Sequence, residues 1–326
     1  MRRRSLLLVS LFLLMGCGRG KDTFDPAPPP GNPQPNATTG AAKSLVDARK
    51  GFKTKLVQAP PPKEPVDEPP VKLFRTVKYD APVGKCAAYL TPDPKDGKKH
   101  PAIVWITGGD CNSIGDVWKP APANNDQTAA QYRQAEIIMM FPSLRGGNEN
   151  PGRREGFLGE VDDVLAAADF LAKQSYVDSD RIYLGGHSTG GTLTLLVSEC
   201  SGLFHAVFSF GPAADPAGYG DDNVWTPFDF KNPKELELRA PIHWLGSITS
   251  PTFVFEGMRK GNIDSLNEMS SAGANPNVKF FPVANADHFS LLAPVNRLIA
   301  GKILKDDGPK CSLSFTQDEV NAAVRR

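Results

Sequence analysis

Short apolar runs recur along residues 102–282, and each suits a β-strand that is covered on both faces. They are residues 102–106, 136–141, 181–185, 206–210, 252–256 and 278–282. Between the second and third runs, apolar residues repeat with helical spacing and share one face: Val161, Val164, Leu165, Ala168 and Leu171. Strands that alternate with helices in this way predict an α/β fold with a mostly parallel, twisted sheet and helices on both faces.

The ends of this pattern define the predicted domain. Residues 71–79 and 85–90 predict two antiparallel strands joined by a turn. Near the other end, Pro294 suits the first position of a final helix. We therefore expect one domain at residues 71–305, followed by a polar C-terminal tail at residues 306–326.

Residues 17–70 are rich in proline and polar side chains. Such a segment cannot bury a core of its own, so we expect a semi-extended tether. A stretch within it has some helical character. Its apolar residues Leu45, Phe52 and Leu56 either rest on the surface of the domain or belong to a transient helix.

The N-terminus has the pattern of an export signal. A basic start precedes an apolar run at residues 5–15, which is too short to cross a bilayer as a helix. The run ends in Leu-Met-Gly-Cys at residues 14–17, which resembles the lipobox of bacterial lipoprotein signal peptides. The resemblance implies removal of residues 1–16, lipidation of Cys17 and, since Gly18 stands in place of aspartate, attachment at the periplasmic face of the outer membrane. An ordinary secretory signal or an uncleaved anchor is the alternative.

The net charge and the cysteines indicate which ligands and which disulfide bonds the chain could have. The formal net charge is +1 at pH 7, which gives no electrostatic reason to expect nucleic acid. Neither a Cys-x-x-Cys motif nor a histidine-rich cluster predicts a metal site, and we expect no cofactor. Export would place the chain in an oxidising compartment. Four cysteines then allow three disulfide pairings, or remain as buried free thiols: Cys86, Cys111, Cys200 and Cys311.

Glycines flank a single serine directly after the apolar run at residues 181–185. Residues 186–190 read Gly-His-Ser-Thr-Gly and match G-x-S-x-G, the nucleophile elbow. This motif places a serine on a tight strand-to-helix turn, whose neighbours must lack bulk. The hydroxyl then projects at the positive N-terminal end of the following helix, which makes Ser188 the candidate nucleophile.

The succession of motifs resembles the α/β-hydrolase fold. It is most similar to the catalytic domains of prolyl-oligopeptidase-like and dienelactone-hydrolase-like serine hydrolases, over nearly all of residues 71–304. The motifs that carry the resemblance are Gly108-Gly109, Arg145-Gly146, residues 163–167, Arg181-Ile182, the elbow, Pro251-Thr252 and Asp287-His288-Phe289. Each is short, and their order and spacing together make the resemblance specific.

The resemblance also implies the base. A serine hydroxyl needs a base to take its proton, and similar hydrolases carry a histidine in the loop after the last strand. His288 has that position. Four other histidines are expected to be structural or exposed: His100, His187, His205 and His243. Although His187 precedes Ser188, we expect its side chain to point away from the site.

The acid of the triad is less determined. The resemblance implies an acid between the serine and the histidine in chain order, and the usual aspartate is absent. Glu256 interrupts an apolar strand, where a carboxylate needs a cationic or hydrogen-bonding partner, so we favour it. Asp264 is the alternative acid, although acids also favour the first turn of a helix. Asp215 and Asp221 are further options.

The remaining site residues follow from the same resemblance. The backbone N–H groups of Gly109 and Thr189 are the expected oxyanion hole. Arg145 either binds a substrate carboxylate or forms a structural ion pair. Three aromatic residues either cap the site or pack within the domain: Trp225, Phe228 and Phe230.

The resemblance implies a serine hydrolase that cleaves an ester or amide bond through an acyl-enzyme, without metal or cofactor. Its substrate would be a small ester or a peptide, and the choice between esterase and peptidase stays open. The alternative is a binding lipoprotein with a catalytically silent α/β-hydrolase fold, which the missing aspartate favours.

Overall fold

The computed structural model describes residues 44–220 and 226–325, which contain an eight-stranded sheet. The strand order is β1-β2-β4-β3-β5-β6-β7-β8, and all pairs from β4 to β8 are parallel. The strands are β1 Arg75–Ala81, β2 Gly84–Leu90, β3 His100–Ile106, β4 Ile138–Pro142, β5 Val177–His187, β6 Val207–Phe210, β7 Thr252–Gly257 and β8 Val278–Val283. The predicted α/β fold and its antiparallel opening pair are therefore confirmed.

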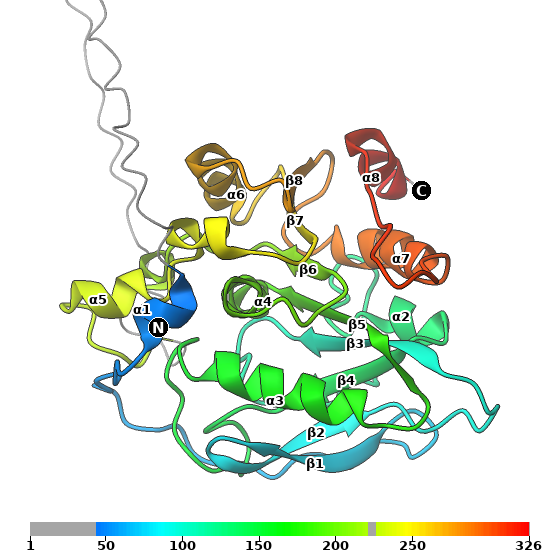
Figure 1. Cartoon of the computed structure of the whole chain (residues 1–326), viewed down its shortest axis with the longest axis horizontal. Helices are drawn as coiled ribbons and strands as arrows, with labels where there is room; N and C mark the ends of the chain where they lie inside the picture. Colours follow the sequence, from blue (N-terminus) through cyan, green and yellow to red (C-terminus); the bar gives the residue numbers. More distant parts are fainter. Residues whose placement is uncertain (1–43, 221–225, 326) are drawn as a thin grey trace, which may run out of the picture. The chain divides into compact units, whose positions relative to one another are not determined.

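Helices cover both faces of this sheet (Figure 1). One face packs against α1 (Leu45–Arg49), α3 (Glu160–Ala172) and α4 (Thr189–Cys200). The other packs against α2 (Ala130–Gln134) and α7 (Leu292–Ile303). Because the central strands are covered on both sides, most of their buried residues are apolar, as expected of a parallel sheet.

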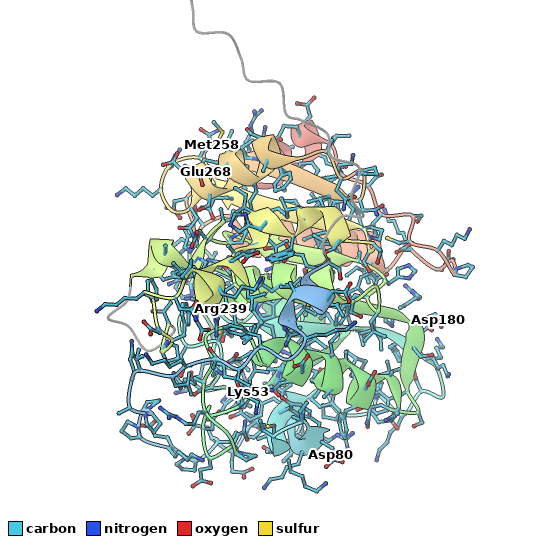
Figure 2. The ribbon with its side chains drawn as sticks, turned by 60° about the vertical axis from the view of Figure 1, so that its left-hand side comes forward. Lys53, Asp80, Asp180, Arg239, Met258 and Glu268 are labelled. Carbon is cyan, nitrogen blue, oxygen red and sulfur yellow. The ribbon has the colours of Figure 1, made fainter. Side chains whose placement is uncertain are left out.

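Smaller elements complete the domain. They are α5 (Pro233–Glu237), α6 (Ile263–Ala272), α8 (Gln317–Ala323) and three short 3₁₀ turns at Pro216–Tyr219, Pro241–His243 and Leu245–Ser247. Figure 2 shows Asp80, on β1, and Glu268, on α6, at opposite ends of the domain.

The chain packs onto the domain well before residue 71, where we expected the domain to begin. Ser44 caps α1, and Leu45 is fully buried in the core beneath it. Arg49 forms an ion pair with Asp162 at 2.9 Å, and Leu56 forms a β-bridge with Phe228. The sequence left Leu45 and Leu56 open between a contact with the domain and a transient helix, and the structure shows that both contact the domain.

The C-terminal residues also belong to the domain. Thr316 and Glu319 form a capping box at the start of α8, and Val320 on that helix is fully buried. Phe315 packs edge-on against Phe253, with ring centroids 4.7 Å apart. The polar average of this tail therefore hid the few apolar residues that anchor it.

The four cysteines of the described residues are free, so none of the three pairings is present. No helix among those residues is long and apolar enough to cross a membrane. The predicted signal peptide and Cys17 lie outside the described residues.

Candidate active site

Ser188 lies on a strained turn between β5 and α4. Its φ of 55° and ψ of −117° are in a region that non-glycine residues rarely adopt. Its N–H donates to the Phe210 carbonyl at 2.7 Å, which ties the turn to the end of β6. A Cβ on Gly190 would lie 2.4 Å from the Ile106 carbonyl oxygen, and one on Gly186 2.6 Å from that of Gly190. The turn therefore requires both glycines of the motif.

Glu256 and His288 form a hydrogen-bonded pair beside this turn. Glu256 is fully buried near the end of β7, and its Oε2 accepts from His288 Nδ1 at 3.0 Å. The backbone N–H of His288 donates to Lys260, which fixes the loop that carries the imidazole. Because Nδ1 carries the proton shared with the carboxylate, Nε2 is left with a lone pair.

The end of β6 brings this pair to the serine. Phe210 accepts from the Ser188 N–H, and the next residue, Gly211, lies directly against the Glu256–His288 pair. A Cβ on Gly211 would lie 2.3 Å from Glu256 Oε2 and 2.4 Å from His288 Cε1. Over the described chain, no hydrogen bond joins Ser188 to His288, and such bonds are often long without substrate. The three groups share the carboxyl edge of the sheet, where ligands bind in α/β folds.

His187 also belongs to this site, and the expectation that it points away is wrong. β5 continues through His187, so its side chain is directed under the His288 loop while Ser188 turns out of the strand. His187 Nε2 donates to the His288 carbonyl at 2.9 Å, and the two ring centroids are 4.5 Å apart. Burial, together with nearby His288, lowers the pKa of His187 to about 3. The neutral ring therefore supports the backbone of the candidate base.

The predicted oxyanion loop lies against the start of α4. Thr189 Oγ1 donates to the Gly109 carbonyl at 2.8 Å, and Gly109 has a φ of +72°, which favours glycine. Thr189 is the first residue of α4, so its N–H lacks an acceptor within the helix. Beyond this loop is a cavity of about 470 Å³, lined by Asp110 and Arg154. These two residues form an ion pair at 2.7 Å.

The other acids that were considered lie elsewhere or outside the described residues. Asp264 is exposed in the first turn of α6, where a carboxylate stabilises the helix end. Asp215 accepts from the Ala217 N–H and caps a 3₁₀ turn. Asp221 is not among the described residues. Of the described candidates, Glu256 is the one that contacts His288.

Arg145 forms a structural ion-pair network. It is buried, and its guanidinium donates to both Asp163 oxygens at 2.9 Å and to Glu155 at 2.7 Å. These contacts occupy the guanidinium N–H groups that would otherwise bind a substrate carboxylate. Of the two roles that we considered for Arg145, the structure therefore supports the structural ion pair and not the binding of a substrate carboxylate.

Phe228 packs within the domain. It stacks on Phe230 with ring centroids 4.9 Å apart, and the Arg239 guanidinium lies 4.1 Å from its ring centre. This arrangement favours packing over a cap for both phenylalanines. Trp225 lies outside the described residues.

Comparisons with known proteins agree with this architecture. Residues 124–267 match the prolyl oligopeptidase family. A dual function macrocyclase-peptidase of Galerina marginata is 31% identical over 163 residues, which cover 44% of this chain and 21% of that protein. A Bacillus subtilis protein described as an uncharacterized peptidase, YtmA, is 25% identical over 185 residues, covering 53% of this chain and 68% of that protein.

Solved peptidases share the fold. Dipeptidyl peptidase 4 of Porphyromonas gingivalis superposes with a TM-score of 0.59 at 16% identity, over 71% of this chain and 35% of that one. The acylaminoacyl peptidase of Pyrococcus horikoshii gives 0.58 at 16% identity, over 77% and 44%. This chain thus spans about a fifth of the fungal relative and less than half of these structures. Residues 124–267 therefore match the prolyl oligopeptidase family, and the sheet that contains them has the α/β-hydrolase fold of these solved peptidases.

Proposed function

We propose that this protein is a serine peptidase that cleaves peptide bonds through Ser188, His288 and Glu256. The observation that carries the proposal is the 3.0 Å hydrogen bond between buried Glu256 and His288 beside the strained turn of Ser188. A buried carboxylate that fixes one imidazole tautomer is what a serine nucleophile needs from its surroundings. The match to the prolyl oligopeptidase family supports a peptide as substrate.

The proposed reaction proceeds by acyl transfer. His288 Nε2 takes the proton of the Ser188 hydroxyl as its oxygen attacks the substrate carbonyl carbon. The developing oxyanion is stabilised by the backbone N–H groups of Thr189 and Gly109. His288 then gives its proton to the leaving amine, and the C–N bond breaks to leave an acyl group on Ser188. Water attacks this ester with His288 again as base, which releases the acid and restores the serine.

The contact between Glu256 and His288 also bears on the alternative of a silent binding protein. That alternative drew its support from the missing aspartate of the triad. Glu256 supplies a carboxylate in the same relation to the imidazole, so nothing in the site favours loss of catalysis. Activated esters are expected to react as well, because they share the acyl-transfer step and have better leaving groups.

A fluorophosphonate probe tests this proposal, because it reacts with activated serines and not with ordinary hydroxyls. We expect stoichiometric labelling of the wild type and of Ser270→Ala, an exposed serine on α6 that serves as the matched control. Ser188→Ala should not be labelled. Equal labelling of Ser188→Ala, or an unlabelled wild type, would refute the role of Ser188.

We also propose, from the sequence alone, that lipidated Cys17 anchors the protein at the periplasmic face of the bacterial outer membrane. The support is the lipobox-like sequence at residues 14–17. Replacement of Cys17 by serine should move the protein from the detergent phase to the aqueous phase in phase partitioning. Retention of Cys17→Ser in the detergent phase, although its signal peptide has been cleaved, would exclude this anchor.

A further inference from the structure

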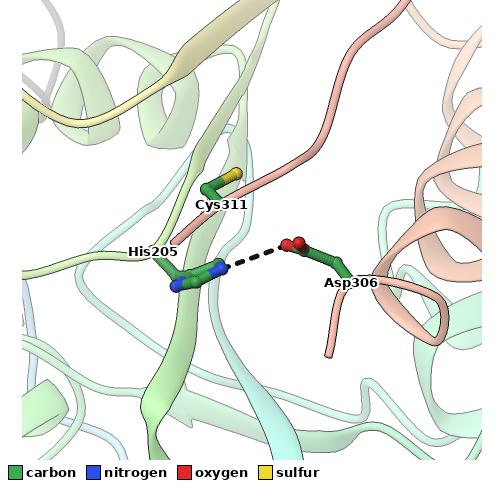
Figure 3. Close-up of side chains that lie close together, drawn as sticks. All are labelled: His205, Asp306 and Cys311. Carbon is green, nitrogen blue, oxygen red and sulfur yellow. Dashed lines mark ion pairs between the residues drawn. The ribbon is translucent and has the colours of Figure 1, made fainter. Parts of the chain in front are cut away.

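Three potential metal ligands meet at the sheet edge opposite to the candidate active site. His205 lies just before β6, Asp306 follows α7, and Cys311 belongs to the segment that returns along the sheet. Figure 3 shows these side chains gathered from separate segments. One imidazole nitrogen, one carboxylate oxygen and the sulfur lie within 4.8 Å of one another. Ser188 is at the carboxyl end of β5, whereas His205 precedes the amino end of β6, so the cluster is separate from the triad.

The imidazole of His205 directs Nε2 into the cluster, where it faces Asp306 without forming a hydrogen bond. His205 Nε2 is 3.1 Å from Asp306 Oδ2, and the exposed fractions of the two side chains are only 5% and 0%. The contact nevertheless lacks hydrogen-bond geometry, and Nε2 is buried without a hydrogen-bond partner. A buried donor or acceptor in this state costs about 1–3 kcal/mol. A metal ion would remove that cost, because the lone pair of Nε2 would then bind the ion. Ligands of one metal direct their lone pairs at the ion and not at one another, so they need not form hydrogen bonds with each other.

The surroundings hold Asp306 in the manner of a metal-binding carboxylate. Its Oδ1 accepts from the Ser312 N–H at 2.9 Å and from the Ser312 hydroxyl at 2.8 Å. Its Oδ2 accepts from the Tyr183 hydroxyl at 3.0 Å, and the Tyr183 ring packs edge-on against His205. Such outer contacts orient the ligands of metal sites and are part of their design.

We propose that His205, Asp306 and Cys311 bind a divalent transition-metal ion, with Zn²⁺ as the best match. Nitrogen, oxygen and sulfur ligands together suit zinc, and three protein ligands leave a fourth tetrahedral position for water. Binding replaces the S–H bond of Cys311 by a sulfur–metal bond and releases one proton to the solvent. The ion would join the segment after α7 to the start of β6 and so stabilise the C-terminal part of the domain.

Cobalt substitution tests the site directly, since Co²⁺ reports both thiolate ligation and tetrahedral geometry in its absorption spectrum. Purified protein treated with a chelator should bind one Co²⁺ with a thiolate charge-transfer band, and Zn²⁺ should displace it. Cys311→Ser should abolish the band, and His205→Gln should weaken Zn²⁺ binding at least tenfold. Cys200→Ser is the matched control, because Cys200 is also a free, partly buried cysteine and should leave the band unchanged.

A measurement on the wild type covers the case in which these variants fail to fold. Zn²⁺ should slow alkylation of Cys311 by N-ethylmaleimide at least tenfold, as followed by peptide mass spectrometry, and leave the rate at Cys200 unchanged. An unaltered rate at Cys311, or a cobalt band that persists in Cys311→Ser, would overturn the proposal. Because neither measurement uses activity, the result is independent of the proposed peptidase function.

Discussion

Replacement of Glu256 by glutamine should separate the acid of the triad from its alternative. Glu256 Oε2 accepts from His288, whereas Oε1 is buried without a hydrogen-bond partner. A glutamine side chain must therefore choose between two unfavourable orientations. If its carbonyl faces His288, a buried NH₂ group is left without an acceptor. If its NH₂ group faces His288, it donates to Nδ1 and forces the proton onto Nε2, which then cannot act as base.

The size of the effect follows from these two costs. An unsatisfied buried NH₂ group costs about 1–3 kcal/mol, and the neutral amide also no longer stabilises the imidazolium that forms during catalysis. The other orientation removes the base, and replacing the triad acid of a serine protease by its amide lowers kcat by about 10⁴. We expect kcat/KM of Glu256→Gln to fall by about 10³–10⁴, which corresponds to about 4–5.5 kcal/mol of transition-state stabilisation.

The assay compares turnover of a p-nitrophenyl ester and of a chromogenic peptide by Glu256→Gln and Asp264→Asn. Asp264 is exposed in the first turn of α6, so Asp264→Asn should retain activity within about twofold of the wild type. Circular dichroism and thermal unfolding show whether both variants fold. A Glu256→Gln enzyme within tenfold of the wild type, or a larger loss in Asp264→Asn, would refute the assignment of the acid.

Two further predictions concern buried groups of the domain. The unfolded chain protonates His187 near pH 6.5 and the folded chain near pH 3, so the free energy of unfolding should fall as the pH falls through this window. Urea unfolding should show roughly 1.5 kcal/mol of this loss between pH 6.5 and pH 5 in the wild type and not in His187→Gln; parallel pH profiles would contradict it. Arg239→Met should cost about 3–5 kcal/mol of stability, because it leaves the fully buried partner carboxylate of Glu235 without its cation. Thermal unfolding checks this against Lys55→Met, which removes an exposed ion pair and should have a much smaller effect; equal effects would refute the reasoning.

Sequence pattern predicted most of the sheet, because the parallel strands are covered on both faces and therefore apolar. The strand at residues 252–256 and the glycine-flanked serine after 181–185 have signals that do not depend on tertiary contacts. The short helix α2 gave no such signal: it follows Ala129, whose φ of 47° is unusual for alanine, and it has fewer than two full turns. Contacts with α7 and β4 stabilise it in the folded domain.

The sequence indicated which serine and which histidine belong to the candidate site. It did not indicate how the side chains around them are arranged. The sequence placed Ser188 by its motif and His288 by its position before the last helix. It left Glu256 and Asp264 open, because which carboxylate reaches the imidazole depends on how β7 and the following loop pack together. His187 was missed because β5 runs two residues further than the apolar run indicated, and that extension decides where its side chain points.

The segments at both ends were missed for a related reason. Average composition described residues 44–70 and 306–325 as polar, although a few side chains anchor them. Leu45 and Val320 are fully buried, and each lies in a short helix whose first turn is capped by a hydroxyl. The sequence pattern named Leu45 as a possible contact, whereas Val320 is recognised as an anchor only when the surface that receives it is known.

The central claim is that Ser188 forms an acyl-enzyme, and mass spectrometry of the acid-quenched enzyme during turnover of an activated ester tests it most directly. The account predicts an adduct of the acyl group on the peptide that contains Ser188, absent from Ser188→Ala and formed far more slowly in His288→Ala. Steady turnover by Ser188→Ala would contradict it. So would an acyl adduct on another residue that forms and breaks down fast enough to account for turnover.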